Sequence, residues 1–294
     1  MNLLEEIEDH PLCGDGAMGT LLMERGVPPH RCFEELCLSR PELIREIHEA
    51  YFAAGARVIE TNTFGANAVR LARHGLANRV NEINWHAAQL ARHAAKGAFV
   101  AGSIGPLGVS SSHAADQGID REDCFRTQMG ALLDGGVDLI FLETFQDLEE
   151  LLLALRVKHS LHHCPAICSL APNETGQLPD GLSLDDAFGK LQQNDAEILG
   201  INCVNGPKEA LRLVEQLARS EPPLAAFPNA GQPRYYEGRY LYEVSPEYFA
   251  EMGALMAARG VRIIGGCCGT TPSHIAALAK TLAGKKSASV RKRT

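Results

Sequence analysis

The sequence predicts an α/β protein that folds as a single (β/α)8 TIM barrel. Eight short runs of β-forming residues alternate with longer amphipathic stretches along the chain. Several of these runs, such as VDLIFLET and VRIIGGC, are almost continuously apolar, which is typical of strands buried on both faces of a parallel sheet. Polar side chains gather where the runs end, and barrels of this class place their active sites at that end.

Each predicted strand is short and is followed by a stretch of helical pattern. The strands are expected at Leu12–Asp15, Arg57–Thr61, Ala98–Ser103, Val137–Glu143, Pro165–Ala171, Glu197–Cys203, Leu224–Pro228 and Val261–Cys267. An open, doubly wound sheet is the alternative, but eight strand–helix repeats on one chain favour the barrel. The 294 residues contain no low-complexity linker, so we expect one barrel domain over residues 1–284 and a flexible tail over residues 285–294.

The helices are predicted from the spacing of their apolar residues. Residues 41–54 carry Leu43, Ile44, Ile47 and Tyr51 at helical spacing, with Pro41 in the first turn and Ser39 as the expected cap. Helices are expected in the same way at residues 148–157, 208–218 and 246–259. A glycine follows three predicted helices just before the next strand, and we expect each to adopt the left-handed conformation that ends a helix: Gly55, Gly136 and Gly260.

Composition and charge exclude several classes of protein. Apolar residues make up 45% and charged residues 22% of the chain, as in an ordinary folded globular protein. No apolar run approaches the ~18 residues that a membrane span needs. The first ten residues hold four acidic side chains and no basic one, so we expect no signal peptide and a cytoplasmic location. The net charge is −8 even with five basic residues in the tail, so we expect no binding to nucleic acid.

The nine cysteines are too irregularly spaced for a disulfide framework. Six of them are predicted to be small buried hydrophobic residues: Cys13, Cys32, Cys37, Cys124, Cys164 and Cys168. The other three, Cys203, Cys267 and Cys268, follow two predicted strands whose ends can converge. Glycines on both sides of the Cys267–Cys268 pair permit a kink that turns both sulfur atoms to one point. We favour a metal site over the alternatives, which are a vicinal disulfide or three unrelated core cysteines.

Three thiolates suit a borderline cation, and zinc is the usual one. Three protein ligands leave the fourth tetrahedral position open, as in catalytic zinc sites. A zinc ion with three thiolates is a weak Lewis acid, so its natural task is to bind a substrate thiol and hold it as a nucleophilic thiolate. The cysteine pattern therefore indicates alkyl transfer to sulfur rather than hydrolysis.

Six motifs follow one another along the chain: GDGAMGT, ETNTFGAN, GSIGP, GINCVNGP, FPNAG and GGCCGTTP. In this order they resemble the homocysteine S-methyltransferase family, from about residue 12 to residue 282, and look nearest to its methionine synthase branch. The resemblance implies a methyltransferase of methionine biosynthesis with the same barrel fold. It also implies zinc ligands at Cys203, Cys267 and Cys268. Asp15 and Glu143 would bind the homocysteine ammonium, and backbone N–H groups between Gly16 and Gly19 would bind its carboxylate.

The residues agree with what the resemblance implies. An amino acid substrate needs an anionic partner for its ammonium and N–H donors for its carboxylate. Asp15 and Glu143 supply the charge, and the loop containing Gly16, Ala17 and Met18 supplies N–H groups before a short predicted helix. The alternatives are a helix cap for Asp15 and a structural ion pair for Glu143. Three asparagines at predicted strand ends are candidates for binding substrate or orienting other ligands: Asn62, Asn202 and Asn229.

The sequence indicates the methyl acceptor more clearly than the methyl donor. A quaternary ammonium such as betaine needs an aromatic cage. The family's betaine enzymes have an aromatic residue where this chain has Gly65, and Trp85 is predicted to pack in a helix. We therefore favour S-methylmethionine or a separate methylcorrinoid protein. The alternative function is a zinc- and thiol-binding barrel subunit of a larger methyl-transfer complex, with no turnover alone.

Overall fold

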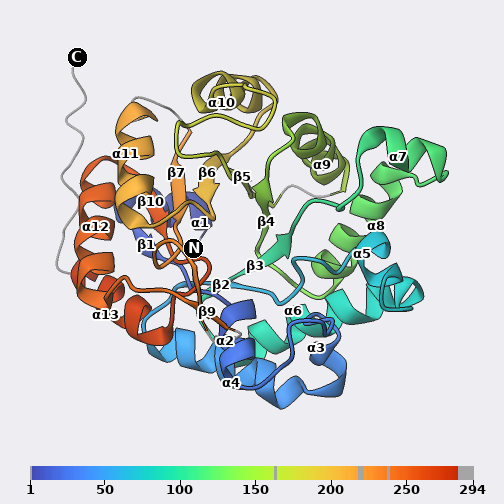
Figure 1. The fold of residues 1–294 in the computed structure, drawn as a ribbon, viewed down its shortest axis with the longest axis horizontal. Helices are drawn as coiled ribbons and strands as arrows, with labels where there is room; N and C mark the ends of the chain where they lie inside the picture. Colours follow the sequence, from blue (N-terminus) through green and yellow to red (C-terminus); the bar gives the residue numbers. More distant parts are fainter. Residues whose placement is uncertain (1, 162–163, 218–221, 237–238, 284–294) are drawn as a thin grey trace.

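The computed structural model describes residues 2–161, 164–217, 222–236 and 239–283. Eight parallel strands form one sheet in the order β1-β10-β7-β6-β5-β4-β3-β2 (Figure 1). The two ends of this order meet, because Gly14 pairs with Val58 and the Arg57 N–H donates to the Cys13 carbonyl over 2.7 Å. The sheet is therefore the predicted barrel, and the open sheet is excluded.

All eight predicted strands are present, most of them shorter than predicted. They are β1 (Leu12–Cys13), β2 (Val58–Glu60), β3 (Phe99–Ile104), β4 (Leu139–Phe145), β5 (Ala166–Leu170), β6 (Ile198–Asn202), β7 (Leu224–Phe227) and β10 (Val261–Ile264). β10 ends three residues before the predicted Cys267, because the backbone there turns to bond to other loops. The N–H of Gly266 donates to Asp15 O, and that of Cys267 donates to Pro228 O, each over 2.8 Å.

Helices surround the barrel (Figure 1). They are α1 (Leu3–Asp9), α2 (Gly19–Glu24), α3 (Leu36–Ser39), α4 (Pro41–Ala53), α5 (Ala68–Ala72), η1 (Ala77–Arg79), α6 (Val80–Ala94), α7 (Ser111–Asp116), α8 (Arg121–Asp134), α9 (Leu148–Leu161), α10 (Leu184–Gln193), α11 (Pro207–Leu217), α12 (Pro246–Ala258) and α13 (Pro272–Ala283). The four helices predicted by residue range all form, although Ala218 of the third lies outside the described residues.

Three predictions about helix ends are confirmed, and one about a helix start is wrong. Gly55, Gly136 and Gly260 have positive φ angles of 104°, 84° and 97°, so their left-handed conformation is confirmed. The predicted cap at Ser39 is wrong. Ser39 ends α3, and its hydroxyl donates to Glu35 over 2.9 Å, while α4 begins after Arg40 without a side-chain cap. Proline at the first position fixes the start of α4 without one, since it has no N–H to satisfy.

The core has two parts, as barrels require. Inward side chains of the strands, such as Leu139, Ile167 and Ile198, fill the interior and are fully buried. Leu3 and Ile7 of α1 pack into this same cluster, so α1 closes the barrel at the amino ends of its strands. A larger apolar layer joins the outer face of the sheet to the helices. The functional end is therefore the opposite, carboxyl end, where the loops after the strands gather.

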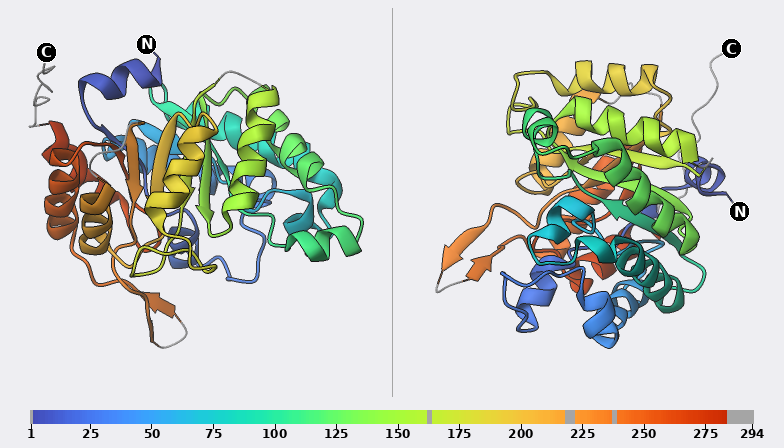
Figure 2. Two further views of the ribbon diagram at one scale, coloured as in Figure 1. Left: turned by 90° about the horizontal axis from the view of Figure 1, so that it is seen from above. Right: turned by 90° about the vertical axis from the view of Figure 1, so that its right-hand side faces the viewer.

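No hairpin was predicted from the sequence. Between β7 and α12 the chain forms a small antiparallel hairpin of β8 (Arg234–Tyr236) and β9 (Arg239–Leu241). Figure 2 shows it projecting from the barrel body on the side opposite α1. Tyr235 and Tyr240 stack edge to face on it, and both are more than half exposed. Its three tyrosines, Tyr235, Tyr236 and Tyr240, face solvent rather than a core, so the pattern of buried strands could not reveal it.

Further predictions concern packing. The six cysteines expected in the core are all buried. Trp85 lies on α6 as predicted, where its ring packs against His86 while 42% of the residue stays exposed. No helix among the described residues is long and apolar enough to span a membrane. The predicted flexible tail lies outside the described residues.

Candidate metal centre and substrate pocket

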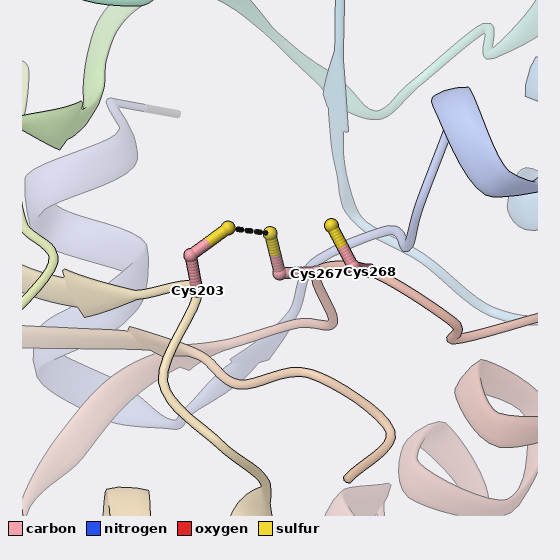
Figure 3. A group of neighbouring side chains, drawn as sticks. All are labelled: Cys203, Cys267 and Cys268. Atoms are coloured by element: carbon pink, nitrogen blue, oxygen red, sulfur yellow. Dashed lines mark hydrogen bonds between the residues drawn. The ribbon is translucent and has the colours of Figure 1, made fainter. Parts of the chain in front are cut away.

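Three cysteines meet at the carboxyl ends of the strands. The Sγ atoms of Cys203, Cys267 and Cys268 all lie within 4.8 Å of one another, and those of Cys203 and Cys267 are 2.8 Å apart. Figure 3 shows the three side chains pointing to the same side of the backbone. A tetrahedral zinc ion with Zn–S bonds near 2.3 Å needs sulfur atoms ~3.8 Å apart. The three thiols therefore fit a zinc ion after small movements of their side chains.

Backbone conformation brings these cysteines together. Cys203 follows β6 and has a φ of 56°, one of three positive φ values among the described non-glycine residues. Such a conformation is strained, and it turns the Cys203 side chain away from the course of the strand. Cys267 and Cys268 lie beyond the end of β10, where the alternation of side chains along a strand no longer applies.

The glycines beside the cysteine pair act mainly by leaving space. A Cβ on Gly265 would lie 2.3 Å from a ring carbon of Phe227, and one on Gly266 would lie 2.4 Å from the Thr270 hydroxyl oxygen. Only Gly269 adopts a left-handed conformation, with a φ of 79°. The predicted kink is therefore present, but close packing rather than unusual φ angles explains two of its three glycines.

A cavity of about 370 Å³ opens beside the thiols. Most residues proposed from the sequence for substrate or metal line it: Asp15, Gly16, Ala17, Met18, Asn62, Glu143, Cys203, Cys267 and Cys268. Asn202 and Asn229 do not. The described residues of its wall include four acidic side chains and no lysine, arginine or histidine. The pocket is small and negative, so it suits a small substrate that carries a positive charge.

The acidic side chains repel one another in this buried setting. Burial and the neighbouring charge of Glu143 raise the pKa of Asp15 well above its usual range, although the Glu60 N–H donates to Asp15 Oδ2 over 3.0 Å. Burial raises the pKa of Glu143 to about 7, even though the Ser103 hydroxyl donates to Glu143 Oε1. Asp15 Oδ1 is buried and has no hydrogen-bond partner. A positively charged donor entering the pocket would satisfy both carboxyls.

Glu60 is the functional candidate that sequence reasoning missed. It ends β2 and lines the cavity beside Glu143. Burial and the charges of Glu143 and Asp15 raise the pKa of Glu60 as well. It could have been found from the sequence, because Glu60 lies near the end of a predicted strand, as Glu143 lies at the end of the strand predicted at Val137–Glu143.

The loop after β1 is fixed by hydrogen bonds to the side chains of Thr270 and Tyr51. The Ala17 N–H donates to the Thr270 hydroxyl over 3.0 Å, and the Tyr51 hydroxyl lies 2.8 Å from Ala17 O. A Cβ on Gly16 would lie 2.7 Å from the same Thr270 oxygen. The Ala17 N–H is therefore already bonded and is not available for a substrate carboxylate. Gly16, together with Met18 and Gly19 at the start of α2, supplies the remaining N–H groups of the predicted set.

The three candidate asparagines bond to the protein. Asn62 Nδ2 donates to Phe33 O over 2.7 Å and so holds the segment of Phe33 and Glu34, which also lines the cavity. Asn202 Oδ1 accepts the Thr144 N–H over 2.8 Å, beside Glu143. Asn229 Nδ2 donates to Cys203 O over 3.3 Å. Each asparagine thus orients a segment that lines the pocket.

The fold and the site define a class of protein: a (β/α)8 barrel with three convergent thiols beside a small acidic pocket at the carboxyl ends of its strands. Within this class, the chain belongs to the homocysteine S-methyltransferase family, whose sequence model matches residues 12–282. That match confirms the resemblance inferred from the motifs.

Relatives with known names support the assignment. The chain is 31% identical over 308 residues to methionine synthase of Mycobacterium tuberculosis and 30% identical over 305 residues to that of Mycobacterium leprae. These alignments cover 97% and 96% of this chain but only 26% and 25% of the relatives, so the chain spans about a quarter of their length. The metallated form of the homocysteine methyltransferase MmuM from Escherichia coli superposes with a TM-score of 0.77 at 29% identity, covering 95% of this chain and 99% of MmuM.

Proposed function

We propose that this chain is a zinc-dependent homocysteine S-methyltransferase that methylates the homocysteine thiolate to give methionine. The observation that carries the proposal is the convergence of Cys203, Cys267 and Cys268 on one wall of an acidic pocket. Family membership supports the substrate, and the metallated state of the related MmuM structure supports the metal. The chemistry of the donor set also fits, since three thiolates are suited to zinc with one open position.

In this proposal the three cysteines would hold the zinc ion. When bound, it supplies a positive centre that lowers the pKa of the homocysteine thiol and keeps it as a nucleophilic thiolate. The cysteine sulfurs would hold this centre at one wall of the cavity, where a substrate thiol could reach it. The rest of the pocket aligns the substrate for an in-line displacement and keeps water away from it.

The acidic side chains would bind the substrate ammonium. Asp15 Oδ1 is a buried acceptor without a partner, and Glu143 is fixed by hydrogen bonds from Ser103 and Asn202. An ammonium group can satisfy both and can reduce the repulsion between the carboxyls. The substrate carboxylate would then face the N–H groups of Gly16, Met18 and Gly19, because that of Ala17 is bonded to Thr270.

The methyl donor is proposed from what the pocket lacks. Gly65 stands where the betaine enzymes carry an aromatic residue, and its N–H donates to Glu34 Oε1 over 2.8 Å. A Cβ at this position would lie 2.6 Å from the same oxygen, so an aromatic side chain here would have to displace the Glu34 carboxylate. We therefore place S-methylmethionine and a methylcorrinoid protein ahead of betaine as donors.

A second function has one observation in its favour. The chain spans only about a quarter of the length of its methionine synthase relatives. It would then serve as the thiol-binding barrel of a larger assembly, with a corrinoid protein as partner and no turnover alone. In either function we propose a cytoplasmic location, because no disulfide joins any of the nine cysteines, all of which lie in the described part of the chain.

A donor screen tests these functions. Purified protein loaded with zinc is given homocysteine and, in separate reactions, S-methylmethionine, free methylcobalamin or betaine, and methionine is measured. Methionine from S-methylmethionine with no other protein present supports the self-sufficient enzyme. Zinc and homocysteine binding without methionine from any small donor supports the subunit. A chain that binds neither zinc nor homocysteine refutes both functions.

A further inference from the structure

Tyr242 lies against the cysteine cluster, although it is outside the motifs of the family resemblance. It directly follows β9, so it connects the projecting hairpin to the barrel. Its ring covers Gly269, the residue after Cys268. A Cβ on Gly269 would lie 2.0 Å from Tyr242 Cγ, so no other residue fits at position 269 while Tyr242 keeps this place.

Backbone hydrogen bonds fix Tyr242 relative to Cys268. The Val244 N–H donates to Ala230 O over 3.1 Å, and the Ala230 N–H donates to Cys268 O over 2.9 Å. On the other side, the Val244 carbonyl is 2.8 Å from His274 Nε2 on α13. The segment after the hairpin is therefore tied to the loop that carries the two adjacent cysteines, and the ring of Tyr242 has a defined position over this loop.

Tyr242 lies over the residue next to Cys268, and its hydroxyl is a neighbour of the Cys268 sulfur. A phenol is protonated at neutral pH, so in a hydrogen bond between the two groups its O–H would be the donor and the sulfur the acceptor. Hydrogen bonds to ligating sulfur atoms fix the direction of the ligand and reduce the charge that it gives to the metal. Losing such a partner typically lowers metal affinity by ten- to a hundredfold.

We propose that Tyr242 is a positioning residue of the metal centre, whose hydroxyl donates to Cys268 Sγ and holds this sulfur toward Cys203 and Cys267. The inference rests on the zinc site of the proposed function. It adds that the hairpin has a chemical task, since the residue after β9 sets the orientation and the donor strength of one ligand. A metal centre with this hydrogen bond is more positive and binds the incoming thiolate more tightly.

The test compares Tyr242→Phe with Tyr240→Phe, which removes a hydroxyl from the exposed part of the same hairpin. Each protein is loaded with cobalt(II), and the sulfur-to-cobalt charge-transfer absorption is recorded. Zinc affinity is measured by competition with a chelator. We expect all variants to take up about one metal ion. Tyr242→Phe should shift the absorption band and weaken zinc binding about ten- to a hundredfold, while Tyr240→Phe matches the wild type.

A second variant, Gly269→Ala, moves the Tyr242 ring without removing its hydroxyl. It should shift the band in the same way, and the double variant with Tyr242→Phe should show little further change. An unchanged band and affinity in Tyr242→Phe would overturn the role of Tyr242 and leave the zinc site standing. Failure of the wild-type protein itself to bind cobalt or zinc would instead overturn the proposed metal centre.

Discussion

Replacing Asp15 by Asn separates substrate binding from structural support. Asn keeps the size of the side chain and still offers an oxygen to the Glu60 N–H, which lies 3.0 Å from Asp15 Oδ2. It removes only the charge. We expect Asp15→Asn to weaken homocysteine binding while zinc content stays at the wild-type level, because the zinc ligands are the three cysteines.

The magnitude follows from the surroundings of the carboxyl group. Asp15 is 2% exposed, and its Oδ1 atom has no partner, so an ammonium would make a charge-assisted hydrogen bond away from water. Such a bond contributes about 1.5–3 kcal/mol, which corresponds to a loss of affinity of roughly ten- to a hundredfold. The loss should be much smaller for 3-mercaptopropionate, which has the thiol and the carboxylate but no ammonium.

The same substitution should not destabilise the folded protein when no homocysteine is bound. Burial raises the pKa of Asp15, so the folded state disfavours its charged form. A raised pKa means that folding takes up a proton and that stability falls as pH rises above the ordinary pKa of a carboxyl group. Asn cannot ionise, so Asp15→Asn should keep or raise the melting temperature at pH 8.

The assay is calorimetric titration of each thiol into zinc-loaded protein, with zinc content and melting temperature measured on the same samples. Equal losses of affinity for homocysteine and 3-mercaptopropionate would refute the ammonium role. A lower melting temperature at pH 8 would show instead that Asp15 supports the fold.

Three further results are expected. Changing Cys203, Cys267 or Cys268 to Ala should remove most of the bound zinc, while Cys168→Ala, a matched change in the core, should retain it; full zinc content in all three variants would end the metal assignment. Homocysteine binding should release about one proton near neutral pH, because a thiol of pKa ~8.5 becomes a metal-bound thiolate. Titration heats that do not depend on the buffer would contradict this. Burial lowers the pKa of His48 to about 4, so the folded state resists its protonation and stability is lost as pH falls below the unfolded value near 6.5. Between pH 7 and pH 5, His48→Leu should lose about 2 kcal/mol less unfolding free energy than the wild type, as measured by urea denaturation.

Burial explains why the fold was predictable. Each strand lies between the barrel interior and a layer of helices, so its sequence is apolar on both faces and is easily recognised. Gly55, Gly136 and Gly260 could also be assigned, because a left-handed helix end has a strong preference for glycine. The hairpin escaped prediction because its tyrosines face solvent, where no periodic burial marks a strand.

The site was predictable wherever a residue's position at a strand end is enough to place it. Cys203, Cys267 and Cys268 could be placed in this way, and the same rule applied to β2 would have included Glu60. Hydrogen bonds between distant segments could not be read from the sequence. Ala17 is one example, since its N–H is bonded to Thr270, which lies 253 positions away along the chain. Tyr242 is another, since only the folded chain brings it to Gly269.

The site can form only after β1 has paired with β10 and β2, the strands on either side of it. β1 has only two residues, and just beyond it the N–H of Gly266 donates to Asp15 O over 2.8 Å. The pocket therefore takes one wall from the start of the chain and another from near its end. A ribosome-bound chain that has emerged only as far as Cys203, just after β6, would present this thiol alone, without the other two. Closing so long a loop is slow, so metal uptake should follow the last step of barrel assembly rather than guide the first.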